Sequence, residues 1–206
     1  MPLAVCSDAS AADWIVASDL PWPRLVTFGP AGFGAYARIR FIPDPVREGQ
    51  RESEANVDAS PDEVEQWRCL LRLLATVTAD PDDCYFALWD GWGFPPAACR
   101  WPTFAVPRGA EPPARVYFLF HRSLAQVAVW GGGYPAHAGV WDRPEFSRGG
   151  APAFVWPSDQ TWCFAADIDP HWAALGASAP LIERVLADSG LDAVEADPAD
   201  PPPAYR

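Results

Sequence analysis

A continuous apolar run from Cys84 to Trp89 is the feature that most constrains how this chain folds. Asp80-Pro81-Asp82-Asp83 precedes the run and Asp90-Gly91 follows it, and both flanks are typical of turns. A short apolar run between turn signals indicates a strand buried on both faces. We therefore expect a central strand at 84–89, with Asp90-Gly-Trp92-Gly presented at its end.

Three segments carry a helical spacing of apolar residues. In residues 60–78 the apolar side chains recur at intervals of about 3.6 residues, and Ser60-Pro61-Asp62-Glu63 is typical of a capping box with proline at the first helical position. Shorter patterns occupy 10–18 and 179–189, with Ser10 and Ser178 as the expected caps. We expect one helix in each segment.

Several further segments have the composition of strands. Residues 35–42 alternate between the two faces, residues 115–121 are apolar throughout, and 24–28, 100–106, 153–156, 161–168 and 191–195 are shorter candidates. Because helices and strands do not alternate regularly, we expect an α+β fold. The prediction is a single domain over 1–206, with a mostly antiparallel central sheet and about three helices packed mainly on one face.

The remaining segments are expected to be loops. The chain contains 24 prolines and 15 glycines, which favours short elements joined by wide connections. Residues 43–59 are the most polar stretch and predict a mobile surface loop, or alternatively a functional lid. Residues 134–152 are rich in glycine and proline, 123–130 fit either a short helical turn or a strand, and 198–206 form a proline-rich tail.

Charge and cysteine content narrow the class of protein. A net charge of −12 argues against a nucleic-acid partner, because the phosphate backbone would be repelled. No apolar run approaches the ~20 residues of a membrane helix, so no membrane partner is expected. The five cysteines form no C-x-x-C pair, which favours reduced thiols and a cytoplasmic location.

Tryptophan provides the first candidate site. The chain holds 11 tryptophans, and Asp90, Trp92, Trp101 and Trp162 are expected to gather near the ends of the central strands. Aromatic walls beside a carboxylate suit a cationic, nucleoside or sugar-like ligand. They equally suit a protein interface, where tryptophan is enriched, and core packing alone accounts for most tryptophans.

A second candidate is Asp167-Ile-Asp169-Pro-His171. Residues two apart on a strand share a face, so Asp167, Asp169 and His171 are possible ligands for a divalent metal. The alternative is a solvated strand end that enters a turn at Pro170. The chain has no phosphate-binding loop and no complete catalytic set, so neither a cofactor nor a catalytic residue is predicted.

Two stretches carry a resemblance to known proteins. Phe-Val-Trp-Pro-Ser-Asp-Gln-Thr-Trp-Cys-Phe-Ala-Ala-Asp-Ile-Asp at 154–169, continuing through Gly176-Ala-Ser178, and Cys-Tyr-Phe-Ala-Leu-Trp-Asp-Gly-Trp-Gly at 84–93 resemble a group of uncharacterised actinobacterial proteins. That resemblance covers most of the chain and implies no functional residue. The layout is also similar to small immunity-type domains of the SMI1/KNR4 kind, an analogy of arrangement without a shared motif.

These observations favour a non-catalytic cytoplasmic module, protein-binding or immunity-like, that presents an acidic, tryptophan-rich surface. Its partner would be another protein or a second copy of the chain. Two alternatives stay open. One is a small-molecule-binding protein or enzyme with a pocket near Asp90, Trp92 and Trp162, and the other is the metal site at Asp167, Asp169 and His171.

Overall fold

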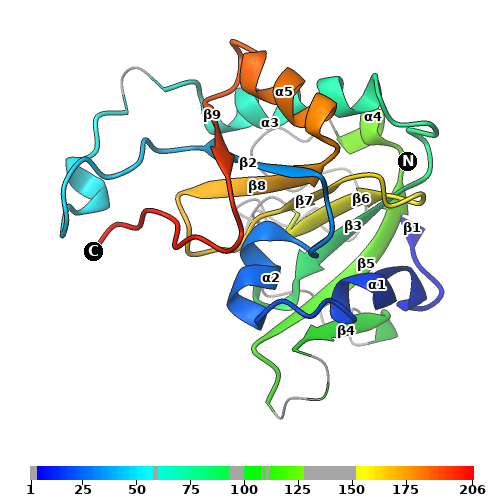
Figure 1. The fold of residues 1–206 in the computed structure, drawn as a ribbon. Helices are drawn as coiled ribbons and strands as arrows, with labels where there is room; N and C mark the ends of the chain where they lie inside the picture. Colours follow the sequence, from blue (N-terminus) through cyan, green and yellow to red (C-terminus); the bar gives the residue numbers. More distant parts are fainter. Residues whose placement is uncertain (1–3, 58–59, 93–99, 108, 110–111, 128–151) are drawn as a thin grey trace.

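The computed structural model describes residues 4–57, 60–92, 100–107, 109, 112–127 and 152–206. A single antiparallel sheet of nine strands runs through them, in the order β1-β5-β3-β6-β7-β8-β2-β9, with β4 also paired to β5 (Figure 1). The strands are β1 Ala4–Val5, β2 Ala35–Arg40, β3 Cys84–Trp89, β4 Thr103–Val106, β5 Arg115–Arg122, β6 Phe154–Pro157, β7 Cys163–Ala165, β8 Trp172–Ala177 and β9 Ala193–Ala196.

The expected central strand is confirmed with both of its boundaries. β3 is hydrogen-bonded to β5 on one side and to β6 on the other. Its side chains alternate between two cores, since Phe86 and Leu88 face one and Ala87 faces the other. The unbroken apolar run at 84–89 therefore reflects burial on both faces of the sheet.

Helices cover both faces of the sheet, which corrects the expectation of one main face. α3 (Glu63–Ala75), α4 (Leu124–Val127) and α5 (Ala179–Ala187) lie on one side, whereas α1 (Asp13–Val16) and α2 (Trp22–Phe28) lie on the other (Figure 1). The described residues thus hold five α-helices where about three were expected. The physical reason is that central strands with two apolar faces need cover on each.

The predicted helix at 60–78 is present but shorter, as α3. Its N-cap is Asp62 and not Ser60, because the Asp62 carboxylate accepts hydrogen bonds from the backbone N–H of Val64 at 2.9 Å and Glu65 at 3.2 Å. The apolar side of the helix packs on the sheet as expected, through Trp67, Leu70, Leu71 and Leu74.

Two predictions near the amino end were wrong in detail. Residues 24–28 belong to the helix α2 and not to a strand, because Leu25, Val26 and Phe28 are buried and packing overrides their strand preference. Residues 10–18 divide into a 3₁₀ turn, η1 (Ser10–Ala12), and α1. Ser10 does not cap the helix, since its own amide and hydroxyl donate to the Asp8 carboxylate.

The segments around the last helix follow the sequence more closely. α5 begins after Ser178, although the Ser178 side chain makes no capping hydrogen bond, and β9 forms the expected edge strand. The strands predicted at 100–106, 153–156 and 161–168 appear as β4, β6 and β7. β8 was not anticipated, because its Trp-Ala-Ala-Leu-Gly-Ala sequence lacks the β-branched residues that mark most strands.

The structure describes most of the loop predicted at 43–59 and little of the loop predicted at 134–152. Residues 43–57 are irregular apart from a 3₁₀ turn, η2 (Glu52–Glu54), and their mobility stays a prediction. Residues 58–59 and most of the loop predicted at 134–152 lie outside the described residues. In the described chain no helix has both the length and the apolarity needed to span a membrane, and Cys6, Cys69, Cys84 and Cys163 are free thiols.

Candidate functional site

A cavity of about 280 Å³ opens at one end of the sheet, where β3 and β7 end and β6 and β8 begin. Four strands meet there because neighbouring antiparallel strands begin and end at the same edge of a sheet. We call it the sheet-end cavity. It is lined by Phe41, Ile42, Glu52, Glu63, Trp89, Trp92, Ala153, Ala166, Asp167, Ile168, Pro170 and His171.

Two tryptophans form the aromatic wall of this cavity. Trp89 ends β3 and Trp92 follows in the 3₁₀ turn η3 (Asp90–Trp92), with the two ring centroids 5.5 Å apart and the planes at 81°. The turn depends on Gly91, because a Cβ at that position would lie 2.1 Å from the Trp89 ring. The glycine after Asp90 therefore allows the two indoles to approach one another edge to face.

Three carboxylates complete the lining, and none of the described residues that line it is an arginine. Burial and the neighbouring charge of Asp62 raise the pKa of Glu63. Among the described residues, none forms an ion pair with Glu52 or Glu63. These two acids therefore give the cavity a negative potential that no ion pair among the described residues neutralises.

The third carboxylate, Asp167, is already neutralised. Its two oxygens accept hydrogen bonds from Arg115 Nε at 3.0 Å and Nη2 at 3.1 Å, and Arg115 Nη2 also reaches Asp169 at 3.2 Å. The Arg115 guanidinium lies 5.5 Å from the Trp89 ring centroid and 6.0 Å from that of Trp22. This arrangement fixes both Asp167 and Trp89 at the cavity wall.

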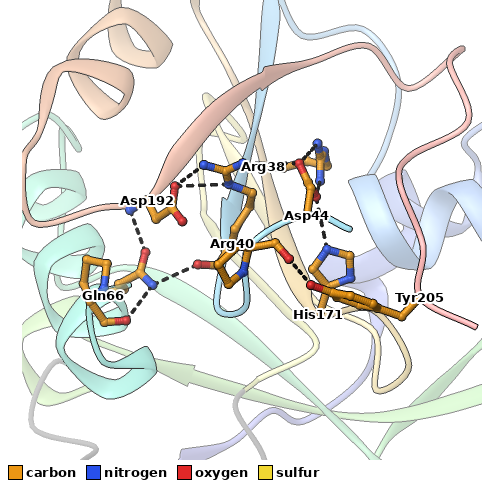
Figure 2. A network of polar contacts seen from close by, with 9 residues as sticks. Arg38, Arg40, Asp44, Gln66, His171, Asp192 and Tyr205 are labelled. Carbon is orange, nitrogen blue, oxygen red and sulfur yellow. Dashed lines mark hydrogen bonds and ion pairs between the residues drawn. The ribbon is translucent and has the colours of Figure 1, made fainter. Parts of the chain in front are cut away.

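His171 faces a separate polar network behind the cavity (Figure 2). Its Nε2 lies 3.1 Å from Asp44 Oδ1, and the Asp44 carboxylate also accepts two hydrogen bonds from Arg38, at 2.7 and 2.9 Å. Burial opposes ionisation of Asp44, but the hydrogen bonds from Arg38 and His171 and the charges of Arg38 and Arg40 outweigh it and lower its pKa to about 2. Asp44 is thus held as an anion that orients His171.

The network continues to the far side of β2. Arg40 donates to Asp192 from Nη2 at 2.5 Å, and the backbone N–H of Asp192 donates to Gln66 Oε1 at 2.8 Å. Gln66 is fully buried and donates to the backbone oxygens of Arg40 and Pro61 at 3.0 and 3.1 Å (Figure 2). These contacts join α3, β2 and the start of β9, so the wall behind the cavity is rigid.

The structure does not bring the predicted metal ligands together. Asp167 and Asp169 both turn to Arg115, whereas His171 turns to Asp44. Within the ranges that the structure describes, no group of three His, Cys, Asp or Glu side chains is placed to hold a metal ion. The Arg115 guanidinium occupies the place beside both carboxylates that a cation would need, so these three residues do not form the predicted metal site.

The predicted tryptophan site is separated into two places. Trp92 lines the cavity, and Asp90 precedes it in η3, where burial raises the pKa of its carboxyl. Trp101 packs edge-on against Phe118 and Phe120, with centroids 5.5 and 5.6 Å away. Of these predicted site residues, Trp92 lines the cavity, whereas Asp90 and Trp101 are not among its lining residues.

Trp162 belongs to the core, and its predicted place beside Asp90 was wrong. It is 1% exposed, and its Nε1–H donates to Thr78 Oγ1 at 3.0 Å. That contact lies near the Cys84 end of β3, whereas Asp90 follows the opposite end. A six-residue strand separates the two ends by roughly 17 Å, so the two side chains cannot share a pocket.

Sequence reasoning missed four contributors to the site. Glu63 was assigned to a capping box, Trp89 to the core, and neither Glu52 nor Arg115 was singled out. The only sequence signal for Arg115 is its position at the start of an apolar strand. An arginine that is partly buried at such a position needs a partner for its charge. Its carboxylate partner lies 52 residues away in the chain, which local patterns do not reveal.

Comparison with known proteins gives no relative: no family model, no curated protein and no solved structure matches the chain. The resemblances to actinobacterial proteins and to SMI1/KNR4-like domains therefore stay predictions.

Proposed function

We propose that this chain is a non-catalytic module, protein-binding or immunity-like, that acts by binding another protein. We further propose that the sheet-end cavity receives a basic side chain of that partner. Residence in the reducing cytoplasm is part of the proposal. The observation that carries it is the combination of Glu52, Glu63 and two tryptophans around a cavity whose described lining holds no arginine. Carboxylates and indole faces are the groups that bind guanidinium and ammonium in proteins.

The size of the cavity favours a side chain over a free ligand. Sites for small organic ligands usually enclose about 300–1,000 Å³. A cavity of about 280 Å³ lies just below that range. One long basic side chain, inserted from a partner whose backbone stays outside, is a better match in volume. The protein's net charge of −12 would also speed the approach of a basic partner.

The chemistry of the lining supports binding rather than catalysis. The described residues that line the cavity include no serine, threonine, cysteine or lysine, so none of them is one of the usual nucleophiles. Its one histidine, His171, has Nε2 engaged by Asp44. The other described histidine, His121, is paired with Asp83 at 2.6 Å and lies toward the opposite end of β3.

A second candidate function is the binding of a small cationic molecule in the same cavity. The observation that favours it is the lining itself, because Glu52, Glu63 and the two indoles can bind a free guanidinium or ammonium as well as one carried by a side chain. It differs from the first candidate in one measurable respect. A small cation would bind as tightly alone as within a peptide, whereas a partner protein adds contacts around the rim.

The test is titration with N-acetyl-arginine N-methylamide, followed by NMR of the indole N–H groups and by calorimetry. We expect saturable shifts at Trp89 and Trp92, and no binding of the citrulline analogue, which has the same shape without the charge. Glu63→Gln should weaken binding by about tenfold, the effect of losing one partly exposed charged hydrogen bond. Trp92→Ala should weaken it by about fivefold through loss of the cation–π contact.

The matched control is Glu65→Gln. Glu65 lies in the same first turn of α3, so the variant changes the net charge and the helix dipole as Glu63→Gln does. It lies outside the cavity lining and pairs with Arg68 on the exposed side of the helix. Equal loss of affinity in both glutamine variants, or equal binding of arginine and citrulline probes, would show that the cavity does not select a cation.

A further inference from the structure

The end of the chain returns to the loop that supplies part of the cavity wall. In Figure 1 the segment near the C label runs beside the loop after β2, although more than 150 residues separate them in the sequence. The Tyr205 hydroxyl donates to the Pro43 carbonyl, and the Arg206 backbone N–H donates to the Gln50 carbonyl at 2.9 Å. These bonds attach residues 205–206 to both halves of the loop.

The loop itself is folded around one buried side chain. Gln50 is 6% exposed, and its Oε1 accepts the backbone N–H of Val46 at 2.8 Å. Its Nε2 donates to the Glu54 carbonyl at 3.4 Å, across the turn that holds Glu52. A contact that fixes the backbone of Gln50 therefore also fixes the position of Glu52, one of the two unneutralised acids of the cavity.

A third contact reaches the cavity wall from behind. The Tyr205 ring lies edge-on to His171, with centroids 4.8 Å apart and planes at 67° (Figure 2). Pro43 directly follows Ile42, so Tyr205 touches one lining residue, His171, and the chain neighbour of another, Ile42. Burial, together with the charges of Asp44 and Glu52, raises the pKa of Tyr205, which places its hydroxyl in the same negative field.

We propose that residues 205–206 act as a strap that holds loop 43–54 against the end of the sheet, and that release of the strap opens the sheet-end cavity. Prolines at 198, 201, 202 and 203 keep the preceding segment stiff and extended, which lowers the entropy lost when the strap attaches. Because single hydrogen bonds and one ring contact secure it, the strap can detach without unfolding the sheet.

The idea that opening the cavity regulates binding rests on the proposed function. The attachment of residues 205–206 to loop 43–54 does not depend on it. Hydrogen exchange of the full chain tests the strap without any ligand. In Tyr205→Ala we expect the amides of Val46 and Gln50 to exchange at least about fivefold faster, while amides of β3 stay unchanged. Tyr205→Phe keeps the ring on His171 and loses only the hydroxyl bond, so its effect should be intermediate.

A second readout links the strap to the cavity. In protein labelled with 5-fluorotryptophan, the ¹⁹F resonance of Trp92, assigned by its loss in Trp92→Phe, should move in Tyr205→Ala. Unchanged exchange at Val46 and Gln50 overturns the strap. Faster exchange with an unmoved Trp92 resonance overturns its coupling to the cavity. A positive result in both measurements with no binding of the arginine probe would refute the proposed function alone.

Discussion

Replacing Asp44 by asparagine should cost this protein much more stability than removing a comparable surface ion pair. Asp44 is 20% exposed, and the Arg38 side chain that it binds is 8% exposed. The bonds from Arg38 and His171 overcome the opposing effect of burial and lower the Asp44 pKa from 3.8 to about 2. This lowering of the Asp44 pKa corresponds to about 2 kcal/mol of folding free energy at neutral pH.

The pH dependence has a definite sign. Because the folded-state pKa of Asp44 is depressed, its contribution is fully present above the unfolded pKa near 4 and is lost as the pH falls toward 2. Asp44→Asn should therefore be less stable than wild type by about 2 kcal/mol at pH 7 and should lose that difference at pH 2. The glutamine control Glu65→Gln removes the exposed pair with Arg68 and should cost about 0–1 kcal/mol.

Urea unfolding followed by tryptophan fluorescence measures both variants. For a urea dependence of about 2 kcal/mol per molar, the Asp44→Asn midpoint at pH 7 should fall by about 1 M. A midpoint shift no larger than that of Glu65→Gln would refute the reasoning. So would a difference from wild type that stays constant from pH 7 to pH 2.

Two further substitutions test how the site is built. Gly91→Ala should destabilise the protein by about 1–3 kcal/mol in urea unfolding and weaken arginine binding, because its Cβ would lie 2.1 Å from the Trp89 ring. The control is Gly34→Ala, which should be nearly neutral because its Cβ would have no neighbour closer than 3.5 Å. Trp162→Phe loses the bond to Thr78 Oγ1 and should cost about 2 kcal/mol in the same assay while leaving the affinity for the arginine probe unchanged; a loss of affinity would return Trp162 to the site.

The candidate site was only half accessible to sequence reasoning. Trp92 and Asp167 were singled out, and both line the cavity. What pairs with each could not be predicted, because Arg115 meets Asp167 across 52 residues and His171 meets Asp44 across 127. Ion pairs form between charged side chains that the fold brings close together in space. The local sequence around Asp167 does not indicate whether its partner is a guanidinium or a metal ion.

The sequence by itself determined the central strand and the helix on top of it. The apolar run of β3 and the apolar stripe of α3 are local periodicities, and burial acts directly on such periodicities. Composition likewise sets the net charge of −12 and the 11 tryptophans without reference to any fold, whereas the acidic, tryptophan-rich surface stays a prediction.

Only the tertiary structure decided where the small residues and the tryptophans belong. β8 is buried along its whole length, which favours small side chains such as alanine, and a Cβ on Gly176 would lie 2.5 Å from the Phe33 ring. Trp162 is core and Trp92 is cavity wall, although both are indoles beside turn residues. The physical reason is that an indole packs favourably both in a core and at a cavity wall. Only the neighbours that the fold supplies decide which of these places a given tryptophan occupies.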